Sequence, residues 1–241
     1  MMMARLRHLQ RRTLLRRPPL VEPAPEPARL LLAKSTPPPN SGLPFGSLSS
    51  RFESNGKPGA IGWDANGGFS YGEYQIASKT GAMTSFLTFL QTNFTNFYTA
   101  LIHMGGNAAA LTGTDGFKQA WRVLAAKPAF VQAQNAFIKF THYDPLLAHL
   151  KAAPGLNADN YSIALKNVIW SVAVQYGSAS KLIQNALQDK TIAAMTETQI
   201  IEAVYNERNN VGKYFPRSTP QVQKALLARF AHERALALAE I

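Results

Sequence analysis

A glycine-rich segment between residues 54 and 78 limits the possible folds of this 241-residue chain more than any other part of it. The segment holds six glycines and one proline, and its FSYGEYQI stretch alternates apolar with polar residues. Such glycine density is typical of turns, and alternation with a period of two is typical of a strand. The segment therefore predicts turns and a small β-hairpin.

The rest of the chain from residue 41 onward shows helical spacing of apolar residues. Residues 41–53 can form a short helix just before the glycine-rich segment. Thr114 and Ser162 are suitable N-caps, because their hydroxyls can accept backbone N–H bonds. Pro145 is expected to interrupt any helix around it. The sequence therefore predicts a mostly helical domain with one hairpin insert. The helical pattern resumes at residue 83, and further helices are expected over 115–124, 128–140, 162–176, 181–188, 197–206 and 221–238.

The first forty residues differ in composition from the rest. They hold eight of the chain's fifteen prolines, and eight Lys and Arg residues against two Glu. Proline at this density cannot donate to helix or sheet hydrogen bonds, so residues 1–40 are predicted to be a mostly disordered basic arm and 41–241 the folded domain. The arm has no apolar core of a signal peptide, and no apolar run in the chain is long enough for a transmembrane helix.

Charge and cysteine content narrow the functional classes. Residues 41–241 hold seventeen basic and twelve acidic residues, a moderately basic balance that suits a polyanionic partner. Nucleic acid, an anionic membrane surface and a cell wall all meet that description. The chain holds no cysteine, which excludes disulfides and thiol catalysis.

Three acidic residues stand in or beside the glycine-rich segment: Glu53, Asp64 and Glu73. Glycoside cleavage needs a protonated carboxylic acid for the leaving oxygen, and a second group that stabilises the oxocarbenium-like centre or activates water. Aromatic neighbours such as Trp63 and Phe69 would partly desolvate Glu53 and favour its protonated form. The pattern makes this segment a candidate catalytic site.

The segment ESNGKPGAIGWDANGGFSYGEYQIAS resembles the catalytic segment of the lysozyme superfamily. In goose-type lysozymes and soluble lytic transglycosylases, a Glu-Ser pair ends a helix and a Gly-x-x-Gln-Ile element follows it. Glu53-Ser54 and residues 72–76 fit this arrangement. VIWSVAVQYG, AVYNER and KYFPRS are similar to further elements of phage endolysin domains and of toxin extensions on type VI secretion spike proteins. The resemblance covers roughly residues 43–236.

This resemblance implies a lysozyme-like α+β fold that is mainly α, with a helical lobe, a small β-hairpin lobe and a cleft between them. It implies cleavage of the β-1,4 bond between N-acetylmuramic acid and N-acetylglucosamine in peptidoglycan, with Glu53 as general acid and no cofactor. Asp64 is preferred as second acid by its position on the hairpin, and Glu73 competes with it. The residues expected to contact the sugars are Ser70, Tyr71, Gln75, Gln175, Tyr176, Tyr205 and Glu207.

Other functions have weaker support in the sequence. His142 and His149 are separated by Pro145, and the DANGG motif lacks the later glycine and glutamate of a calcium loop, so no metal site is predicted. The basic arm could bind nucleic acid without sequence preference, but the folded part offers no recognition helix rich in arginine. A lytic transglycosylase, a chitosanase or chitinase, and a non-catalytic wall-binding module remain alternatives.

The expected lack of a signal peptide limits how the protein could reach the cell wall. The protein would be made in the cytoplasm and would act in the periplasm or cell wall. It would reach the wall through phage lysis machinery or through a secretion apparatus such as type VI. In the second case a secretion spike component and a cognate immunity protein are the expected partners.

Overall fold

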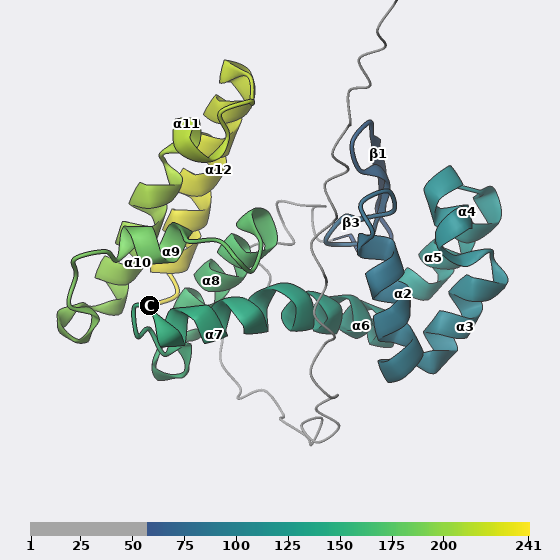
Figure 1. Cartoon of the computed structure of the whole chain (residues 1–241), viewed down its shortest axis with the longest axis horizontal. Helices are drawn as coiled ribbons and strands as arrows, with labels where there is room; N and C mark the ends of the chain where they lie inside the picture. The colour runs from purple at the N-terminus through teal and green to yellow at the C-terminus, as the bar shows by residue number, and fades with distance from the viewer. Residues whose placement is uncertain (1–56) are drawn as a thin grey trace, which may run out of the picture. The chain divides into compact units, whose positions relative to one another are not determined.

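The computed structural model describes residues 57–241 of the chain. The arm over residues 1–40, the helix expected over 41–53 and Glu53 itself lie outside the described residues. The described part is mostly helical and carries one small antiparallel sheet (Figure 1). The predicted balance of helix and strand is therefore confirmed.

The glycine-rich segment forms a sheet of three strands, one more than the predicted hairpin. β1 (Ile61–Asp64) pairs with β2 (Gly68–Tyr71), and β2 pairs with β3 (Ile76–Ala77). Gly72 connects β2 to the turn that follows, with a φ of 83°. That left-handed conformation is open to glycine at little cost, which explains why glycine stands where the chain reverses.

Four helices follow the sheet, and aromatic rings fill the core beside them. The rings of Phe86, of Trp121 and of Phe130, which lies on the next helix along the chain, contact one another with centroid distances of 5.1 to 6.1 Å. Thr114 caps one of these helices by accepting the N–H of Phe117, as predicted. The helices are α2 (Ala82–Asn93), α3 (Thr95–His103), α4 (Gly106–Thr112) and α5 (Asp115–Ala125).

A long helical rod follows, formed by α6 (Pro128–Ile138), the π-helical turn η1 (Lys139–Tyr143) and α7 (Asp144–Ala152) (Figure 1). The prediction that Pro145 interrupts the helix is wrong. Pro145 lies in the first turn of α7, directly after the wider π-helical turn. A π turn shifts the hydrogen-bond register by one residue, which helps the helix to continue through a residue that has no N–H.

The next long helix is α8 (Ile163–Tyr176), which packs against α10 (Glu197–Arg208) and α12 (Pro220–Leu238) and whose residues from Leu165 to Ala173 are almost all buried. Ser162 caps α8 by accepting the N–H of Ala164, again as predicted. Trp170 on α8 contacts the rings of Tyr143 and Tyr74, so α8 is packed against both η1 and the turn after β2. The remaining helices are η2 (Ala158–Asn160), α9 (Leu182–Ala186), η3 (Ile192–Ala194) and α11 (Val211–Tyr214).

Candidate functional site

Asp64 ends β1 and is exposed at the tip of the sheet. Its Oδ1 accepts the backbone N–H of Asn66 at 2.8 Å and that of Gly67 at 2.7 Å. The ammonium of Lys79 holds the same turn by donating to the carbonyl of Ala65 at 3.0 Å. The carboxylate of Asp64 therefore closes its own turn, in the manner of an Asx turn.

Glu73 lies in the turn between β2 and β3 and is only 9% exposed. Its backbone N–H donates to Oε1 of Gln134 on α6 at 3.0 Å. The neighbouring Tyr74 hydroxyl donates to Oδ1 of Asn135 at 2.6 Å, and its ring lies 6.0 Å from that of Trp170. The second acidic candidate is thus held among buried groups, in contrast to Asp64.

Ser70 and Gln75 are hydrogen-bonded to each other across the turn after β2. The Ser70 hydroxyl donates to Oε1 of Gln75 at 2.6 Å, and Nε2 of Gln75 donates to the carbonyl of Gly72 at 2.9 Å. Gln75 has a φ of 50°, a left-handed conformation that side chains other than glycine rarely adopt. The expected sugar-contacting Ser70, on β2, and Gln75, in the turn that holds Glu73, are therefore joined directly to each other.

Tyr71, by contrast, belongs to the core. Its side chain is fully buried, and its hydroxyl donates to the carbonyl of Ala110 at 2.8 Å. Its ring packs edge-on against Phe117 and tilted against Trp121. Burial raises the pKa of Tyr71 to about 12. In this structure the side chain stabilises the contact of β2 with α4 and α5 and presents no surface to a glycan.

A second polar cluster joins α8, α10 and α12. Nη1 of Arg208 lies 2.8 Å from Oε2 of Glu233, and both side chains are completely buried. The Ser171 hydroxyl donates to the same carboxylate oxygen at 2.8 Å, and Nε of Arg229 donates to the other at 2.7 Å. Burial alone would raise the pKa of Glu233, but Arg208, Arg229 and Ser171 bring it below its ordinary value.

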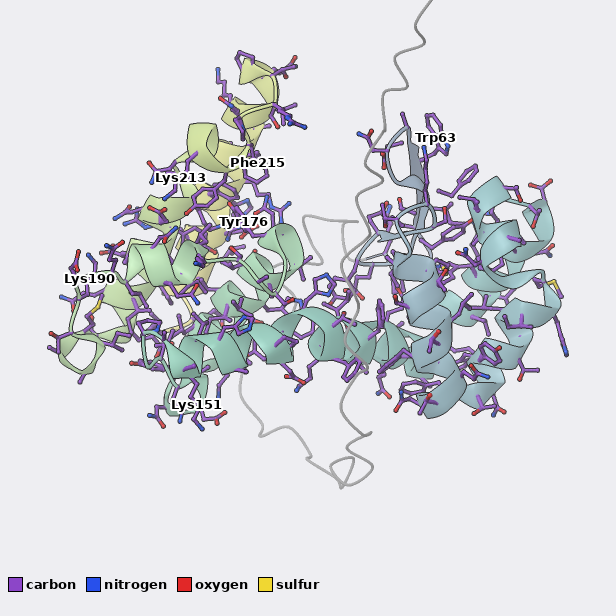
Figure 2. The ribbon with its side chains drawn as sticks, in the orientation of Figure 1. Trp63, Lys151, Tyr176, Lys190, Lys213 and Phe215 are labelled. Atoms are coloured by element: carbon purple, nitrogen blue, oxygen red, sulfur yellow. The ribbon has the colours of Figure 1, made fainter. Side chains whose placement is uncertain are left out.

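Three of the expected sugar-contacting residues surround this second cluster. Gln175 accepts a hydrogen bond of 2.6 Å from Nη2 of Arg208. Tyr205 is fully buried, with its hydroxyl 3.4 Å from Glu233, so it too is a core residue. Tyr176 is partly exposed and its ring packs edge-on against that of Tyr214 at 5.5 Å. Figure 2 shows Tyr176 with the C-terminal helices, apart from Trp63 on the sheet.

Glu207, the last expected residue, faces a different side of α10. Its Oε1 accepts from the Lys213 ammonium at 2.6 Å and from the Tyr214 hydroxyl, and its Oε2 accepts from Asn210 at 3.0 Å. Burial raises the pKa of Glu207, but these hydrogen bonds and the charge of Lys213 lower it below its usual range overall. This carboxylate stabilises the connection from α10 to α11.

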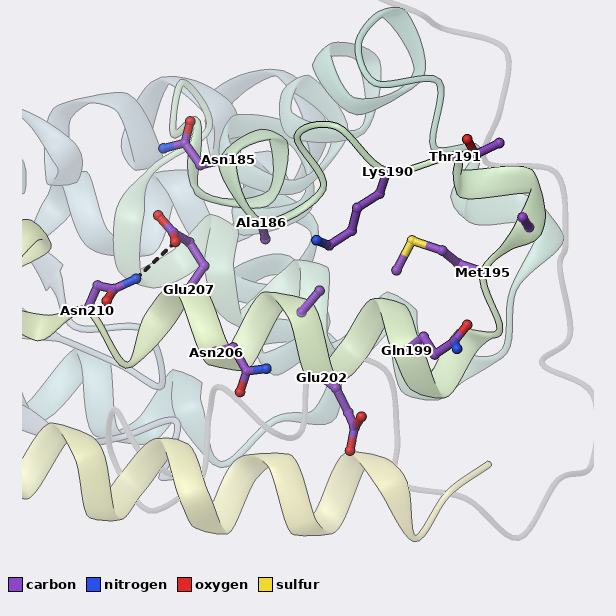
Figure 3. A pocket seen from close by; sticks show the side chains of 12 residues that line it. Asn185, Ala186, Lys190, Thr191, Met195, Gln199, Glu202, Asn206, Glu207 and Asn210 are labelled. Carbon is purple, nitrogen blue, oxygen red and sulfur yellow. Dashed lines mark hydrogen bonds between the residues drawn. The ribbon is translucent and has the colours of Figure 1, made fainter.

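Glu207 also lines a pocket of about 730 Å³ beside α9, η3 and α10 (Figure 3). The other acidic residue there, Glu202, is bound to Arg234 at 2.8 Å. Lys190 points into the pocket, and amide side chains make up much of the remaining polar surface. None of the residues on the sheet contributes to this pocket, so it is separate from the turn that holds Glu73.

The sequence patterns did not identify two buried polar residues as contacts between elements. They place Gln134 and Glu233 in ordinary helices, although each is completely buried and bonded to another element. Gln134 stands on the buried face of α6 between Phe130 and Phe137. A polar residue on an otherwise apolar helix face was the available clue to its role.

Metal binding and membrane insertion find no support within residues 57–241. No cluster of three or more His, Asp or Glu side chains in that range could hold a metal ion. His142 bonds to the hydroxyl of Thr141 at 2.7 Å, and burial lowers its pKa. No helix in the same range is long and apolar enough to span a membrane.

Comparison with known proteins assigns the chain to a family and finds solved structures of similar fold. Residues 45–234 match the family described as type VI secretion system spike protein VgrG3-like, C-terminal. The type VI secretion system spike protein VgrG3 of Vibrio cholerae serotype O1 is 33% identical over 197 residues. The matched region covers 79% of this chain and 18% of that protein, so the chain spans less than a fifth of its curated relative.

Two solved structures share the fold. The GH46 chitosanase of Gynuella sunshinyii in complex with chitotetraose has a TM-score of 0.54 and 16% identity, and the match covers 80% of this chain and 86% of that one. Chitosanase OU01 with substrate has a TM-score of 0.51 and 22% identity, with coverage of 79% and 88%. GH46 chitosanases have a lysozyme-like fold, so the predicted lysozyme-like fold is confirmed.

Proposed function

Because this chain belongs to the family of VgrG3-like C-terminal regions of type VI secretion spike proteins, we propose that it cleaves the glycan strands of peptidoglycan. The observation that carries the proposal is a buried glutamate, Glu73, in the turn between β2 and β3 of a lysozyme-like fold. Most glycosidases use a pair of carboxyl groups, and Glu53, which precedes the sheet in the sequence, is the other candidate.

Glu53 takes the general acid role in this proposal, and Glu73 the second role. Sequence position favours Asp64 as the second acid, but its Oδ1 already accepts two backbone N–H groups in an exposed turn. A carboxylate used in this way gives the hairpin its shape. The turn of Glu73 is instead supported by Gln134 and by the bonded pair of Ser70 and Gln75, a fixed setting of the kind that catalytic groups need.

Peptidoglycan is favoured over chitosan by charge. Chitosan carries an ammonium group on most of its sugars, so an enzyme that binds it benefits from an acidic surface. Residues 41–241 of this chain hold seventeen basic against twelve acidic residues, and Lys79 and Lys118 stand beside the sheet. Peptidoglycan strands have acetylated amines and carry carboxylates, which suits a basic surface.

The family also supports the expected route of delivery. The protein would travel with a type VI secretion spike, act on the wall of a competing cell, and be opposed in its producer by an immunity protein that covers the site. A neighbouring gene product that binds the chain and blocks cleavage would support this part of the proposal. Harmless expression in the periplasm would contradict it.

The experiment that tests the function is digestion of purified peptidoglycan by the full chain, with the products read by mass spectrometry and chitosan as the comparison polymer. We expect muropeptides with reducing ends and no measurable release from chitosan. Anhydromuropeptides would instead identify a lytic transglycosylase. A chain that releases nothing from peptidoglycan would overturn the proposal.

The ranking of the two sheet carboxyls gives a separate prediction. Glu73→Gln should lower kcat on peptidoglycan on the order of 10²-fold, because general acid or base roles contribute about that much or more. Asp64→Asn keeps an oxygen that can accept the turn N–H groups, so kcat should stay within about threefold of wild type. Rates of reducing-end release measure both. The opposite order of effects would restore Asp64 as the second acid.

A further inference from the structure

One buried amide ties the turn of Glu73 to the chain that enters the sheet. Gln134 on α6 is completely buried. Its Oε1 accepts the N–H of Glu73 at 3.0 Å, and its Nε2 donates to the carbonyl of Pro58 at 3.3 Å. The indole N–H of Trp121 donates to the same carbonyl at 3.1 Å. Gln134 therefore uses both ends of its amide to connect two segments that precede and follow β1 and β2.

The contact leaves no spare room. A Cβ on Gly72 would lie 2.1 Å from Oε1 of Gln134 and 2.9 Å from the Trp121 ring. Because Gly72 also has a positive φ, only glycine allows the turn to approach α6 this closely. Asn135, the next residue of α6, accepts the hydroxyl of Tyr74 at 2.6 Å. Two successive residues of α6 thus hold two successive residues of the turn.

We propose that Gln134 is a positioning residue, which holds the backbone of Glu73 and so sets where its carboxyl lies relative to the chain that enters the sheet at Pro58. Pro58 follows Glu53 by five residues in the sequence, and Gln134 binds the backbone of Glu73 itself. The amide is the group that the position requires, since a carboxylate could accept but not donate, and a hydrocarbon could do neither. Gln134 does not touch the substrate. This inference rests on the proposed glycan cleavage.

The structural reason for a catalytic effect is distance. Catalysis by two carboxyls depends on their separation, because that separation decides whether water or the carboxyl itself attacks. A misplacement of about 1 Å can cost on the order of 10²-fold in rate. Loss of the Gln134 bonds would leave the Glu73 carboxyl present and the glycan contacts in place, so the rate of the bound complex should suffer while binding does not.

The test replaces Gln134 by Met, which has similar length and no hydrogen-bonding amide. We expect kcat of Gln134→Met on peptidoglycan to fall between about 10-fold and 100-fold, with KM within about threefold of wild type. Leu150→Ala is the control, because it removes a fully buried side chain on α7, away from the sheet, and destabilises the fold. It should leave kcat unchanged at a temperature where circular dichroism shows both variants folded.

A second measurement is independent of activity. The Glu73 N–H has Gln134 as its acceptor, so its hydrogen exchange in wild type should be slow and at least about tenfold faster in Gln134→Met. Unchanged exchange, or a folded Gln134→Met with wild-type kcat, would overturn the proposal. An inactive wild type with the expected exchange difference would overturn the proposed function, and the positioning contact would stand as a structural one.

Discussion

Replacement of Glu53 by Gln should abolish glycan cleavage, with kcat on peptidoglycan lowered by about 10³-fold or more. The amide has nearly the shape of the carboxyl, but its N–H protons are far too weakly acidic to be transferred to the leaving glycosidic oxygen, and general acid catalysis contributes between about 10² and 10⁴ in rate. Initial rates of reducing-end release from purified peptidoglycan, measured for both proteins at equal concentration, would check this expectation.

The control for this variant is a carboxyl of the same kind elsewhere. Glu202→Gln removes a partly exposed carboxylate on α10 that pairs with Arg234, and it should retain wild-type activity. Binding of Glu53→Gln to insoluble peptidoglycan should also match wild type, since the substitution leaves the contact surface in place. Cleavage by Glu53→Gln at the wild-type rate would mean that another residue is the acid.

The second large effect concerns stability. Glu233→Gln should lower the free energy of unfolding by about 3 to 5 kcal/mol, because it leaves the buried guanidinium of Arg208 without its carboxylate. Both side chains are completely buried, so water cannot take the place of the missing charge. Urea denaturation followed by circular dichroism measures the change. A loss below about 1 kcal/mol, the range of a surface pair, would show that the network contributes little.

The stability difference between wild type and Glu233→Gln should also depend on pH, and the pKa of Glu233 sets the direction of that dependence. The pKa of Glu233 is lower in the folded chain than its ordinary value, so the stability that this group contributes is present above the unfolded pKa of about 4.3. It is lost as the pH falls through the lower folded pKa. The difference in unfolding free energy between wild type and Glu233→Gln should therefore shrink in acid.

A double variant tests the same ion pair. Arg208→Met combined with Glu233→Met should lose less stability than the sum of the losses of the single variants Arg208→Met and Glu233→Met.

Most helices could be predicted because each carries its own local pattern. The capping hydroxyls of Thr114 and Ser162 predict helix starts, and the glycine density before residue 78 predicts the sheet. The failure at Pro145 has a physical cause. The rule against proline inside a helix assumes regular α geometry, and the π-helical turn η1 alters that geometry immediately before it.

The candidate site was harder to predict because it depends on contacts between distant residues. Spacing could place Asp64 and Glu73 on the predicted hairpin, but it could not show that one carboxylate closes a turn and the other belongs to a buried residue. Tyr71 and Tyr205 had the right residue type for sugar contact, and only the fold shows both inside the core. The role of Gln134 depends on Pro58, 76 residues away in sequence, a separation that no local pattern records.

The cluster of Arg208, Glu233 and Ser171 fastens three helices that are remote in sequence, a task that many small exported domains give to disulfides. A fastening made of charge and hydrogen bonds does not respond to the redox potential around it. In the proposed passage from a reducing cytoplasm to an oxidising periplasm, this part of the molecule would need no oxidant, no isomerase and no time for thiol exchange. The stability of this cluster depends on pH and not on the redox potential.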